Sequence, residues 1–428
     1  MRRRTQRSKI QAGGFLLLLL AISFAATARE EDPAPIPAAP ASPLTLAEAE
    51  RLALRASPAL KAAEARIRLE EGRLRQAGLY PNPDLTLDSS WFTGGSGHRE
   101  TILSLRQPIA YPRKRDLEKK EALERIEAAR RDLERERLEI LLETREAYFR
   151  IHFAHEVLKV EEEDLEATRA VRKAVEARVA TGDAAPFESL KASVEVSRAE
   201  SEVSRARGEL AAETASFNLL LGLPADAPTV AAEPSSDLEP AGELPALQAR
   251  ALERQPEIQS RQHTALAAGF AAERARLDRR PDLSAGPALG QETSGFFVGA
   301  GVSVRLPVWN RNQGNIAATE AGREETLAQV DAARLAVSRL VADSYGRYRS
   351  ARAQKLLFEQ GLLSEAAQLV ETARKAYEGG ESGILEVLDA RRTALAVREE
   401  YYRASLDVAL AAVQLRRATG EDLEREPQ

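Results

Sequence analysis

The spacing of hydrophobic and polar residues predicts a chain built mainly of very long helices. Apolar residues recur at helical spacing over residues 46–78, and residues 114–180 contain neither proline nor glycine. A helix of roughly 65 residues, at ~1.5 Å per residue, is about 100 Å long. An equivalent helix is predicted from about residue 313 to residue 377. Tight turns follow both long helices, and a further helix follows each turn.

The two helices after these turns carry an apolar residue at every seventh position. The positions are Val196, Val203, Leu210 and Phe217 in the first helix and Ala394, Tyr401, Val408 and Leu415 in the second. A seven-residue apolar repeat predicts partner helices packed side by side, as in a coiled coil.

Two other regions, at about 83–109 and 281–308, alternate with the period of two that predicts strands. In the second region one face carries Phe296, Val298, Ala300, Val302, Val304 and Leu306, and the other carries Gly299, Gly301, Ser303 and Arg305. A strand of this kind fits between hydrocarbon and water. An ordinary half-buried hairpin is the alternative, but hairpins joined by such long helices have no soluble core to pack on.

The chain contains an internal duplication with an offset of 198 residues. Motifs recur in register around Pro58 and Pro256, Pro83 and Pro281, and Gly182 and Gly380. We therefore predict repeat 1 at 45–223 and repeat 2 at 244–420, with a Pro-rich linker at 224–243 and a tail at 421–428. Each repeat is expected to run helix, β-hairpin, long helix, helix, with the tip turns at about 181–186 and 379–383.

The N-terminus has the features of a secretory signal peptide over residues 1–28. Five basic residues precede a short apolar run from Phe15 to Ala26, and Ala26-Thr27-Ala28 fits a cleavage site. A membrane anchor is the alternative, but the run is shorter than the ~20 apolar residues that a spanning helix needs. A Pro/Ala-rich extended lead is predicted at 29–44. No later segment is apolar for long enough, so membrane insertion would have to use strands.

Composition excludes several classes of function. The net charge of −5 gives no basic surface for nucleic acid, and the absence of cysteine excludes disulfides, thiolate metal sites and a lipid on an N-terminal cysteine. No phosphate-binding glycine loop or nucleophile motif appears, so we predict no enzyme activity and no cofactor. His152 and His155, beside Glu156, are the one credible pair of metal ligands, and two imidazoles without a third ligand make a weak site.

Four strands per chain are too few to close a membrane barrel, and an open sheet edge is not tolerated in lipid. Symmetric association solves this problem, because three copies would supply twelve strands, enough for a barrel with a wide lumen. The same threefold operation would arrange the helical hairpins as a hollow cylinder. The predicted fold class is therefore α plus membrane β-barrel, formed by a homotrimer on a long α-helical tunnel.

Three segments resemble the TolC outer-membrane factor family: GLYPNP at 78–83, LPVWNRNQG at 306–314, and the segment 380–390. The resemblance covers essentially the whole chain after the predicted signal peptide, and RNQG at 311–314 favours the CzcC-type branch, which serves heavy-metal efflux. It implies a homotrimer whose barrel crosses the outer membrane of a Gram-negative-type cell and whose tunnel crosses the periplasm. The implied partners are a periplasmic adaptor (membrane fusion) protein and an inner-membrane RND-type pump, and the implied cargo is heavy-metal cations.

The resemblance also implies roles for the two helix turns, where the tunnel would close and the adaptor would dock. The docking residues would be Thr181, Gly182, Asp183, Gly379, Gly380, Glu381 and Ser382. Glycine permits positive φ in such a reversal, so a structural role explains the glycines equally well.

The same resemblance assigns a periplasmic gate to Glu386, Asp389, Glu188 and Tyr377. Glu386 and Asp389 are three residues apart and share a helix face, so threefold symmetry would form rings of negative charge that favour cations. A solvated helix face is the alternative. Tyr377 matches the tyrosine of the family's tip lock, but Ser382 stands where the family has an arginine, which puts the usual locking contacts in doubt.

Aromatic residues lie at both ends of the predicted strands, as in an interfacial girdle. They are Trp91, Phe92, Phe296 and Phe297 near the outer hairpin turns and Tyr111 and Trp309 near the strand bases. Ordinary packing is the alternative explanation for these residues.

Other functions remain open at this stage. A channel of this type could instead serve multidrug efflux or type I secretion, because the substrate is selected upstream of the channel. A periplasmic coiled-coil scaffold would explain the heptads but not the alternating strands.

Overall fold

The computed structural model describes residues 43–92, 98–109, 111–233, 242–292 and 294–421. The predicted signal peptide, most of the lead, residues 234–241 of the linker and residues 422–428 of the tail lie outside this part of the chain. The description below concerns the unit that begins at Pro37.

The two halves of the chain contain the same elements in the same order. The first half has α1 (Leu46–Ala56), α2 (Pro58–Ala77), β1 (Asp84–Phe92), β2 (His98–Ile109), α3 (Pro112–Thr181) and α4 (Pro186–Leu220). The second half has α5 (Leu244–Arg254), α6 (Pro256–Leu277), β3 (Asp282–Glu292), β4 (Gly295–Arg305), α7 (Gln313–Leu357), η1 (Phe358–Leu362), α8 (Leu363–Glu378) and α9 (Ile384–Thr419).

The starts of equivalent elements agree with the predicted duplication. The helices α2 and α6 begin at Pro58 and Pro256, and β1 and β3 begin at Asp84 and Asp282, each pair separated by 198 residues. The cores are also equivalent, because Ala49, Ala53 and Phe217 are buried in one cluster and their matching residues in another. The matching residues are Leu247, Ala251 and Leu415.

Two predicted helices are interrupted in the structure. The helix predicted over 46–78 is divided at Ser57, whose backbone is extended, because Pro58 cannot follow a helical residue comfortably and starts a new helix. The helix predicted from 313 to 377 is divided by the π turn η1, where Gly361 leaves helical geometry. The matching helix in the first half, α3, is continuous over 70 residues.

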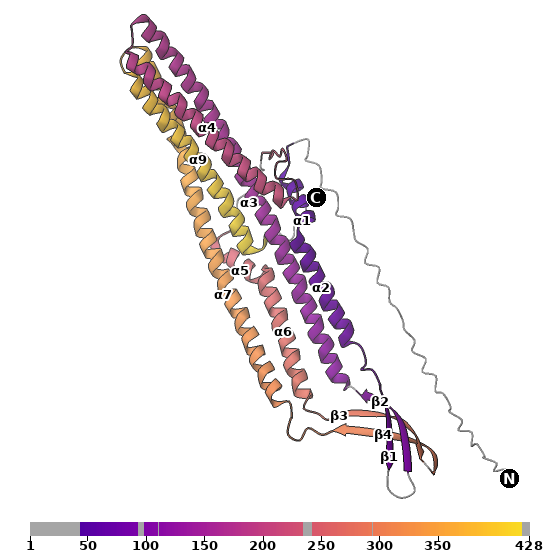
Figure 1. Ribbon diagram of the computed structural model, residues 1–428. Coiled ribbons are helices and arrows are strands. Elements are labelled where there is room, and N and C mark those ends of the chain that lie inside the picture. Colours follow the sequence, from indigo (N-terminus) through magenta and orange to yellow (C-terminus); the bar gives the residue numbers. More distant parts are fainter. Residues whose placement is uncertain (1–42, 93–97, 110, 234–241, 293, 422–428) are drawn as a thin grey trace, which may run out of the picture. The chain divides into compact units, whose positions relative to one another are not determined.

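The helix α3 is the common partner of both halves. It packs against α1, α2 and α4 of its own half and against α6 and α9 of the other. Figure 1 shows α2, α3, α6 and α7 side by side toward the sheet, and the hairpins α3–α4 and α8–α9 side by side at the other end. The heptad residues Val196, Val203 and Phe217 are buried in these contacts, as predicted.

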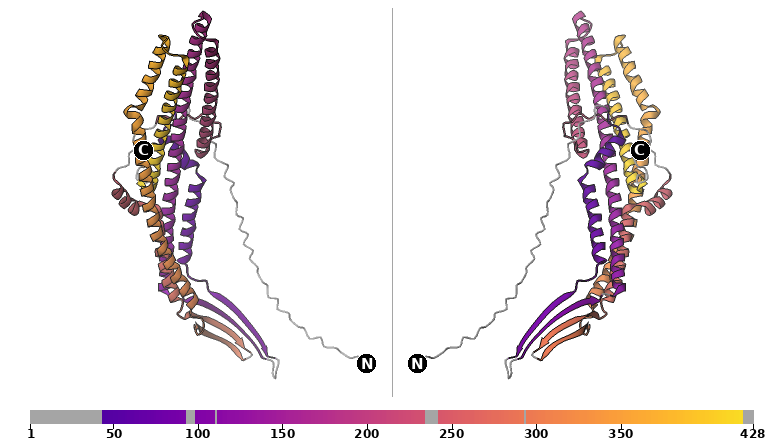
Figure 2. Two further views of the ribbon diagram at one scale, coloured as in Figure 1. Left: turned by 90° about the vertical axis from the view of Figure 1, so that its left-hand side faces the viewer. Right: turned by 90° about the vertical axis from the view of Figure 1, so that its right-hand side faces the viewer.

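The four strands form one antiparallel sheet in the order β1-β2-β3-β4, which extends from the ends of the four helices (Figure 2). Register pairs such as Leu87 with Leu103 and Leu289 with Val298 place the apolar residues of all four strands on one face. Pairs such as Thr86 with Ser104 and Ser284 with Ser303 place the polar residues on the other face. The sheet therefore has the two faces predicted from the alternation.

The apolar face is bare in the single chain. Val298 and Val302 are 71% and 72% exposed, and Leu85, Leu87 and Phe296 are exposed to a similar degree. Within the described residues β1 pairs with β2 alone and β4 pairs with β3 alone, so each has an unpaired edge. No helix in the described part of the chain is both long enough and apolar enough to cross a membrane.

Candidate functional site

The candidate site is the tip, defined here as the two helix turns at 181–186 and 379–383 with the helix ends that join them. In the first turn Gly182 has φ 86°, and its N–H donates to the Val179 carbonyl at 3.1 Å. The Thr181 hydroxyl donates a hydrogen bond of 2.7 Å to the Asp183 carboxylate across the turn. Glycine is required here by the left-handed backbone.

The second turn has the same construction. Gly380 has φ 75°, and the N–H of Glu381 donates to the Ala376 carbonyl at 2.8 Å. The N–H of Ser382 points to the same carbonyl at 3.3 Å. The backbone alone thus explains Gly182 and Gly380, and it leaves the side chains of Asp183 and Glu381 exposed at the end of the molecule.

The two hairpins are joined near the tip by an apolar cluster. Val175 of α3 is buried together with Tyr377 of α8 and with Ile384, Val387 and Leu388 of α9. The second hairpin therefore packs through its α8–α9 end onto the long helix of the first.

A polar contact that the sequence did not reveal reinforces this cluster. The Arg178 guanidinium of α3 lies 4.5 Å from the centre of the Tyr377 ring, and its Nη1 donates to the Tyr377 carbonyl at 3.2 Å. Arg178 thus supplies an arginine partner for Tyr377 although position 382 is serine. In the sequence, Arg178 stands out only as a basic residue in the last turn of a predicted helix. Basic residues are common at helix C-termini, so this position does not indicate a contact with Tyr377.

Three polar atoms at the tip are buried without a hydrogen-bond partner among the described residues. They are the hydroxyl of Tyr377, Oγ of Ser382 and Oε2 of Glu188. Buried polar atoms in native proteins are nearly always bonded. The tip of one chain is therefore left with unused donors and acceptors next to its helix turns.

The predicted gate carboxylates are placed on two helices. Glu386 and Asp389 are both exposed on α9, on the side away from the buried Val387 and Leu388. Glu188 lies half-buried at the matching position on α4. The two α9 carboxylates therefore share a free helix face, as their spacing predicted.

Three arginines of α9 tie the second hairpin to the first. Arg391 donates to the Asp164 carboxylate at 2.7 Å, and this pair is largely shielded from solvent. Arg398 pairs with Glu163 of α3 at 2.7 Å, and Arg392 pairs with Glu195 of α4. The exposed pairs contribute little to stability, whereas the shielded Arg391–Asp164 pair is costly to break.

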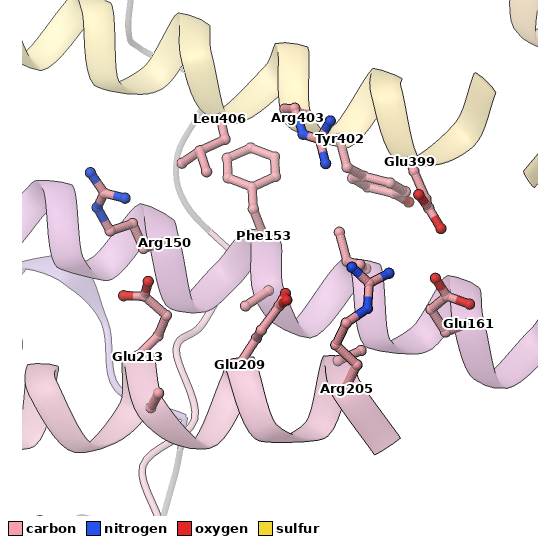
Figure 3. Close-up of a pocket in the computed structure, with 14 residues that line it drawn as sticks. Arg150, Phe153, Glu161, Arg205, Glu209, Glu213, Glu399, Tyr402, Arg403 and Leu406 are labelled. Atoms are coloured by element: carbon pink, nitrogen blue, oxygen red, sulfur yellow. The ribbon is translucent and has the colours of Figure 1, made fainter. Parts of the chain in front are cut away.

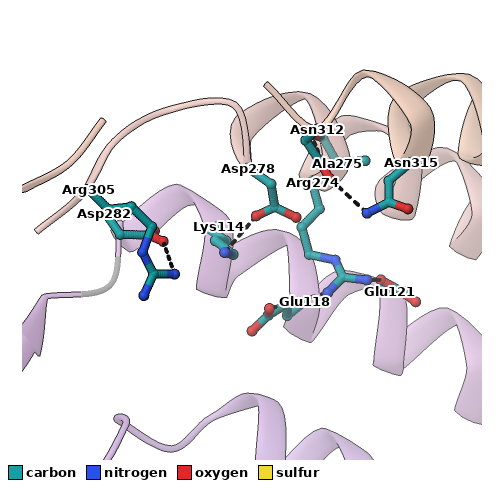
Figure 4. Close-up of polar contacts among 10 residues, drawn as sticks. All are labelled: Lys114, Glu118, Glu121, Arg274, Ala275, Asp278, Asp282, Arg305, Asn312 and Asn315. Carbon is teal, nitrogen blue, oxygen red and sulfur yellow. Dashed lines mark hydrogen bonds and ion pairs between the residues drawn. The ribbon is translucent and has the colours of Figure 1, made fainter. Parts of the chain in front are cut away.

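The junction of sheet and helices holds a second group of polar contacts (Figure 4). Lys114 pairs with Asp278 at 2.6 Å, and Arg274 lies 3.4 Å from Glu118 and 3.3 Å from Glu121. A cavity of about 500 Å³ at this level is bordered by both hairpins of the sheet. The ion pairs hold α3 and α6 together where the strands begin.

The RNQG segment forms the corner between β4 and α7. Asn312 has φ 60°, and its side-chain amide donates to the Ala275 carbonyl of α6 at 2.9 Å. The N–H of Arg311 donates to the Gln313 side chain at 2.7 Å. In this structure the segment has a structural role, because it turns the chain into the helix.

The predicted girdle residues are divided between the two sheet faces. Trp91 and Phe296 lie on the apolar face and are exposed, and Trp309, after β4, is 90% exposed. Phe297 lies on the polar face, where its ring covers Gly290 of the neighbouring strand. It therefore lies on the opposite face from Phe296, because adjacent residues of a strand point to opposite faces, and its place in an aromatic girdle stays a prediction. The side chain of Phe92 lies outside the described residues.

His152 and His155 do not form a metal site with a third ligand in the described part of the chain. His155 Nδ1 lies 3.9 Å from Glu156, and burial lowers the pKa of His152. No group of three or more His, Cys, Asp or Glu side chains suited to a metal ion occurs among the described residues.

Comparison with known proteins places this architecture in a family. The family model described as "Outer membrane efflux protein" matches residues 50–223 and again 247–421. The cobalt-zinc-cadmium resistance protein CzcC of Cupriavidus metallidurans is 28% identical over 95% of this chain and 98% of that protein. The cation efflux system protein CusC of Escherichia coli K12 is 26% identical over 59% of this chain and 58% of its own length.

A solved CusC structure has the same fold, with a TM-score of 0.75 and 20% sequence identity over 87% of this chain and 91% of that one. The family model covers both repeats and most of the chain. The chain therefore belongs to the outer membrane efflux protein family.

Replacing Arg178 by alanine is expected to loosen the tip. The change removes a ring contact and a hydrogen bond together worth about 1–2 kcal/mol. Backbone amides of residues 376–383 should then exchange with deuterium roughly 5- to 30-fold faster. Hydrogen exchange followed by mass spectrometry measures this rate. The matched control is Arg198→Ala, which removes an exposed arginine of α4; equal exchange in the two variants would contradict the role given to Arg178.

Proposed function

We propose that this member of the outer membrane efflux protein family forms, as a homotrimer, the outer-membrane channel of a tripartite efflux system. The other components are a periplasmic adaptor protein and an inner-membrane RND-type pump. The strands cross the outer membrane of a Gram-negative-type cell and the helices extend into the periplasm. The observation that carries this proposal is the four-stranded sheet, with one bare apolar face and two unpaired edges.

Such a sheet is stable in lipid only when other copies complete it. Hydrocarbon offers no hydrogen bonds to the edge groups of β1 and β4, so each unpaired group costs several kcal/mol there. Pairing β4 of one copy with β1 of the next satisfies both edges, and three copies close a barrel of twelve strands. The apolar face then meets lipid, and the polar face lines a wet lumen.

The duplication also supports a proposal for where the helical hairpins of neighbouring copies meet. Within one chain Leu388 of α9 is buried in the cluster that contains Val175 of α3 and is flanked by Val171. The equivalent of Leu388 is Leu190 on α4, which is 64% exposed, and the equivalent of Val171 is Leu369 on α8, which is 46% exposed. Repeating the same packing between copies brings α4 of one chain onto α8 of the next, and covers Leu190 and Leu369.

The transported substrate is proposed to be heavy-metal cations. One relative that spans nearly the whole chain is named for resistance to cobalt, zinc and cadmium, and another is named for cation efflux. In the trimer, Glu386 and Asp389 would place six carboxylates around the axis, with Glu188 nearby. Rings of negative charge favour cations and require no tight binding site.

The tip would serve as gate and docking site. The exposed turns, with Asp183 and Glu381, are available to an adaptor. The buried polar atoms of Tyr377 and Ser382 would become available only when the tip opens. Opening would then move the α8–α9 end away from α3 and break the Arg178–Tyr377 contact. Adaptor binding would favour this state by contacting it better than the closed one.

Disulfide cross-linking tests the arrangement of copies. The natural chain has no cysteine, so Leu190→Cys combined with Leu369→Cys introduces the only thiols. Oxidation of the membrane-embedded protein should produce a covalent trimer on a non-reducing denaturing gel, because each copy links to the next.

Each single-cysteine variant is the control and should remain monomeric on the same gel. Failure of the double variant to link, in a protein that still inserts into the outer membrane, would remove the proposed contact between copies.

Neutralising the proposed gate tests its electrostatics. The combined change Glu386→Gln and Asp389→Asn should reduce cation selectivity and weaken block by divalent cations roughly 10-fold or more, equivalent to about 1.4 kcal/mol of lost attraction. Single-channel recording in planar bilayers measures both quantities. Glu400→Gln, an exposed carboxylate farther along α9, is the matched control and should behave as wild type. Unchanged selectivity in the double variant would exclude these carboxylates from the gate.

The substrate class is tested in the native host. Deleting the gene should lower the tolerated concentrations of Co²⁺, Zn²⁺ and Cd²⁺ and leave tolerance to organic dyes and detergents unchanged. Complementation with the wild-type gene should restore metal tolerance. Sensitivity to dyes without sensitivity to metals would favour drug efflux and would leave the trimeric channel itself intact.

A further inference from the structure

A buried carboxyl pair lies where the two hairpins meet, well away from the tip. Glu161 of α3 is 2% exposed, and its Oε2 meets no hydrogen-bond donor among the described residues. It points toward Glu399 of α9 at one end of a cavity of about 370 Å³ between α3, α4 and α9 (Figure 3). Two ionised carboxylates in this position would repel one another.

We propose that Glu161 and Glu399 hold one proton between them, and that this proton latches α9 of the second hairpin onto α3 of the first. The protonated carboxyl donates its O–H to the ionised one, so the pair carries a single negative charge. When the proton leaves to solvent through the open cavity, both groups are charged and the contact becomes repulsive. The pair therefore holds the hairpins together in one protonation state and pushes them apart in the other.

Other charged groups border the cavity, among them Arg150 of α3 and Arg403 of α9, but none is hydrogen-bonded to Oε2 of Glu161 within the described residues. On α3 the nearest is Asp164, which is bonded to Arg391. On α4 they are Glu202 and Arg205, which are bonded to one another. On α9 the cavity is bordered by Tyr402 and Arg403, and Glu209 and Glu213 border it from α4.

Burial and the neighbouring carboxylates raise the pKa of Glu161 to about 8. A carboxyl pKa that is higher in the folded than in the unfolded state makes the folded state bind more protons between these two values. Stability therefore falls as the pH rises from about 4.5 to about 8, and the loss is complete above that pH. The arginines that tie the hairpins together, such as Arg391 and Arg398, do not titrate in this window.

The carboxyl pair of Glu161 and Glu399 can hold the hairpins together whether or not the protein transports anything. Its effect on opening of the gate rests on the proposed function. The helix α9 carries the proposed gate residues and contacts α3 from the tip, at Val175 and Leu388, to the pair of Arg417 with Glu139. Separation at Glu399 would thus move the same helix that must leave α3 when the tip opens.

The experiment measures the distance between α3 and α9 as a function of pH. Spin labels are attached at Ala167→Cys and Ala396→Cys, which are exposed positions in a chain without natural cysteines. In the purified full-length protein in detergent, the distance distribution should be narrow at pH 6. It should become longer or broader at pH 9.5, with a midpoint near pH 8.

Glu161→Gln and Glu399→Gln should each abolish this change and keep the narrow distribution at both pH values, because an amide donates a hydrogen bond without titrating. Their unfolding temperature should also no longer fall between pH 6 and pH 9.5. The matched control is Glu163→Gln, which removes the charge partner of Arg398 and should keep the wild-type pH response.

A wild-type distance that is the same at both pH values would overturn the proposal. A full pH response in both glutamine variants would overturn it equally. Because no outcome involves conductance or export, failure here leaves the channel function untouched, and failure of the cross-linking test leaves the latch untouched.

Discussion

The unpaired backbone groups of β1 and β4 are the constraint on which the rest of the structure depends. The chain has nine residues in one edge strand and eleven in the other, and each strand has hydrogen-bonding groups directed away from its single partner. In water the backbone groups of such edges can bond to solvent. The bare apolar face beside them is stable in hydrocarbon instead, and hydrocarbon offers these groups no hydrogen bonds. Only further strands satisfy both requirements. An incomplete sheet thus makes association of copies a condition of insertion, and the helices must then follow the symmetry that the sheet imposes.

The duplication gives each chain two similar hairpins, which suits a threefold arrangement of copies. The differences between the two halves show which hairpin bends more easily. Both halves begin their elements 198 residues apart, so six similar hairpins can stand around a threefold axis. Yet α3 is continuous, whereas its counterpart is broken by the π turn at Gly361. A break in the backbone ladder lowers the cost of bending. The second hairpin is therefore the more deformable one, and it is also the one that carries Glu386 and Asp389.

Much of this architecture could be predicted from the sequence, because it is repeated or periodic. The two sheet faces, the long helices, the heptad contacts and the turns at Gly182 and Gly380 follow from patterns of many residues. What was missed rests on single residues: Pro58 and Gly361 interrupt helices, and Phe297 covers Gly290 on the polar face. Arg178 and Glu161 could not be found, because their significance comes from partners on α8 and α9, more than 190 residues away in the chain. Periodicity shows which face of a helix is buried, but not which side chain of another helix contacts that face.

The ties between α3 and the second hairpin indicate what opening must overcome. Arg178 of α3 contacts Tyr377 of α8, and Arg391 and Arg398 of α9 pair with carboxylates of α3. The apolar cluster around Val175 joins the same helices near the tip. A ligand shifts the balance between a closed and an open form only by the difference between its affinities for the two forms. Changing the ratio of open to closed from 1:99 to 99:1 requires a difference of about 5.5 kcal/mol. One turn of one helix offers little surface for such a difference. In the proposed trimer, a partner that engages both turns of every copy makes six such contacts, and their preferences for the open form add. The threefold symmetry would thus make the proposed gate responsive to a weakly discriminating partner.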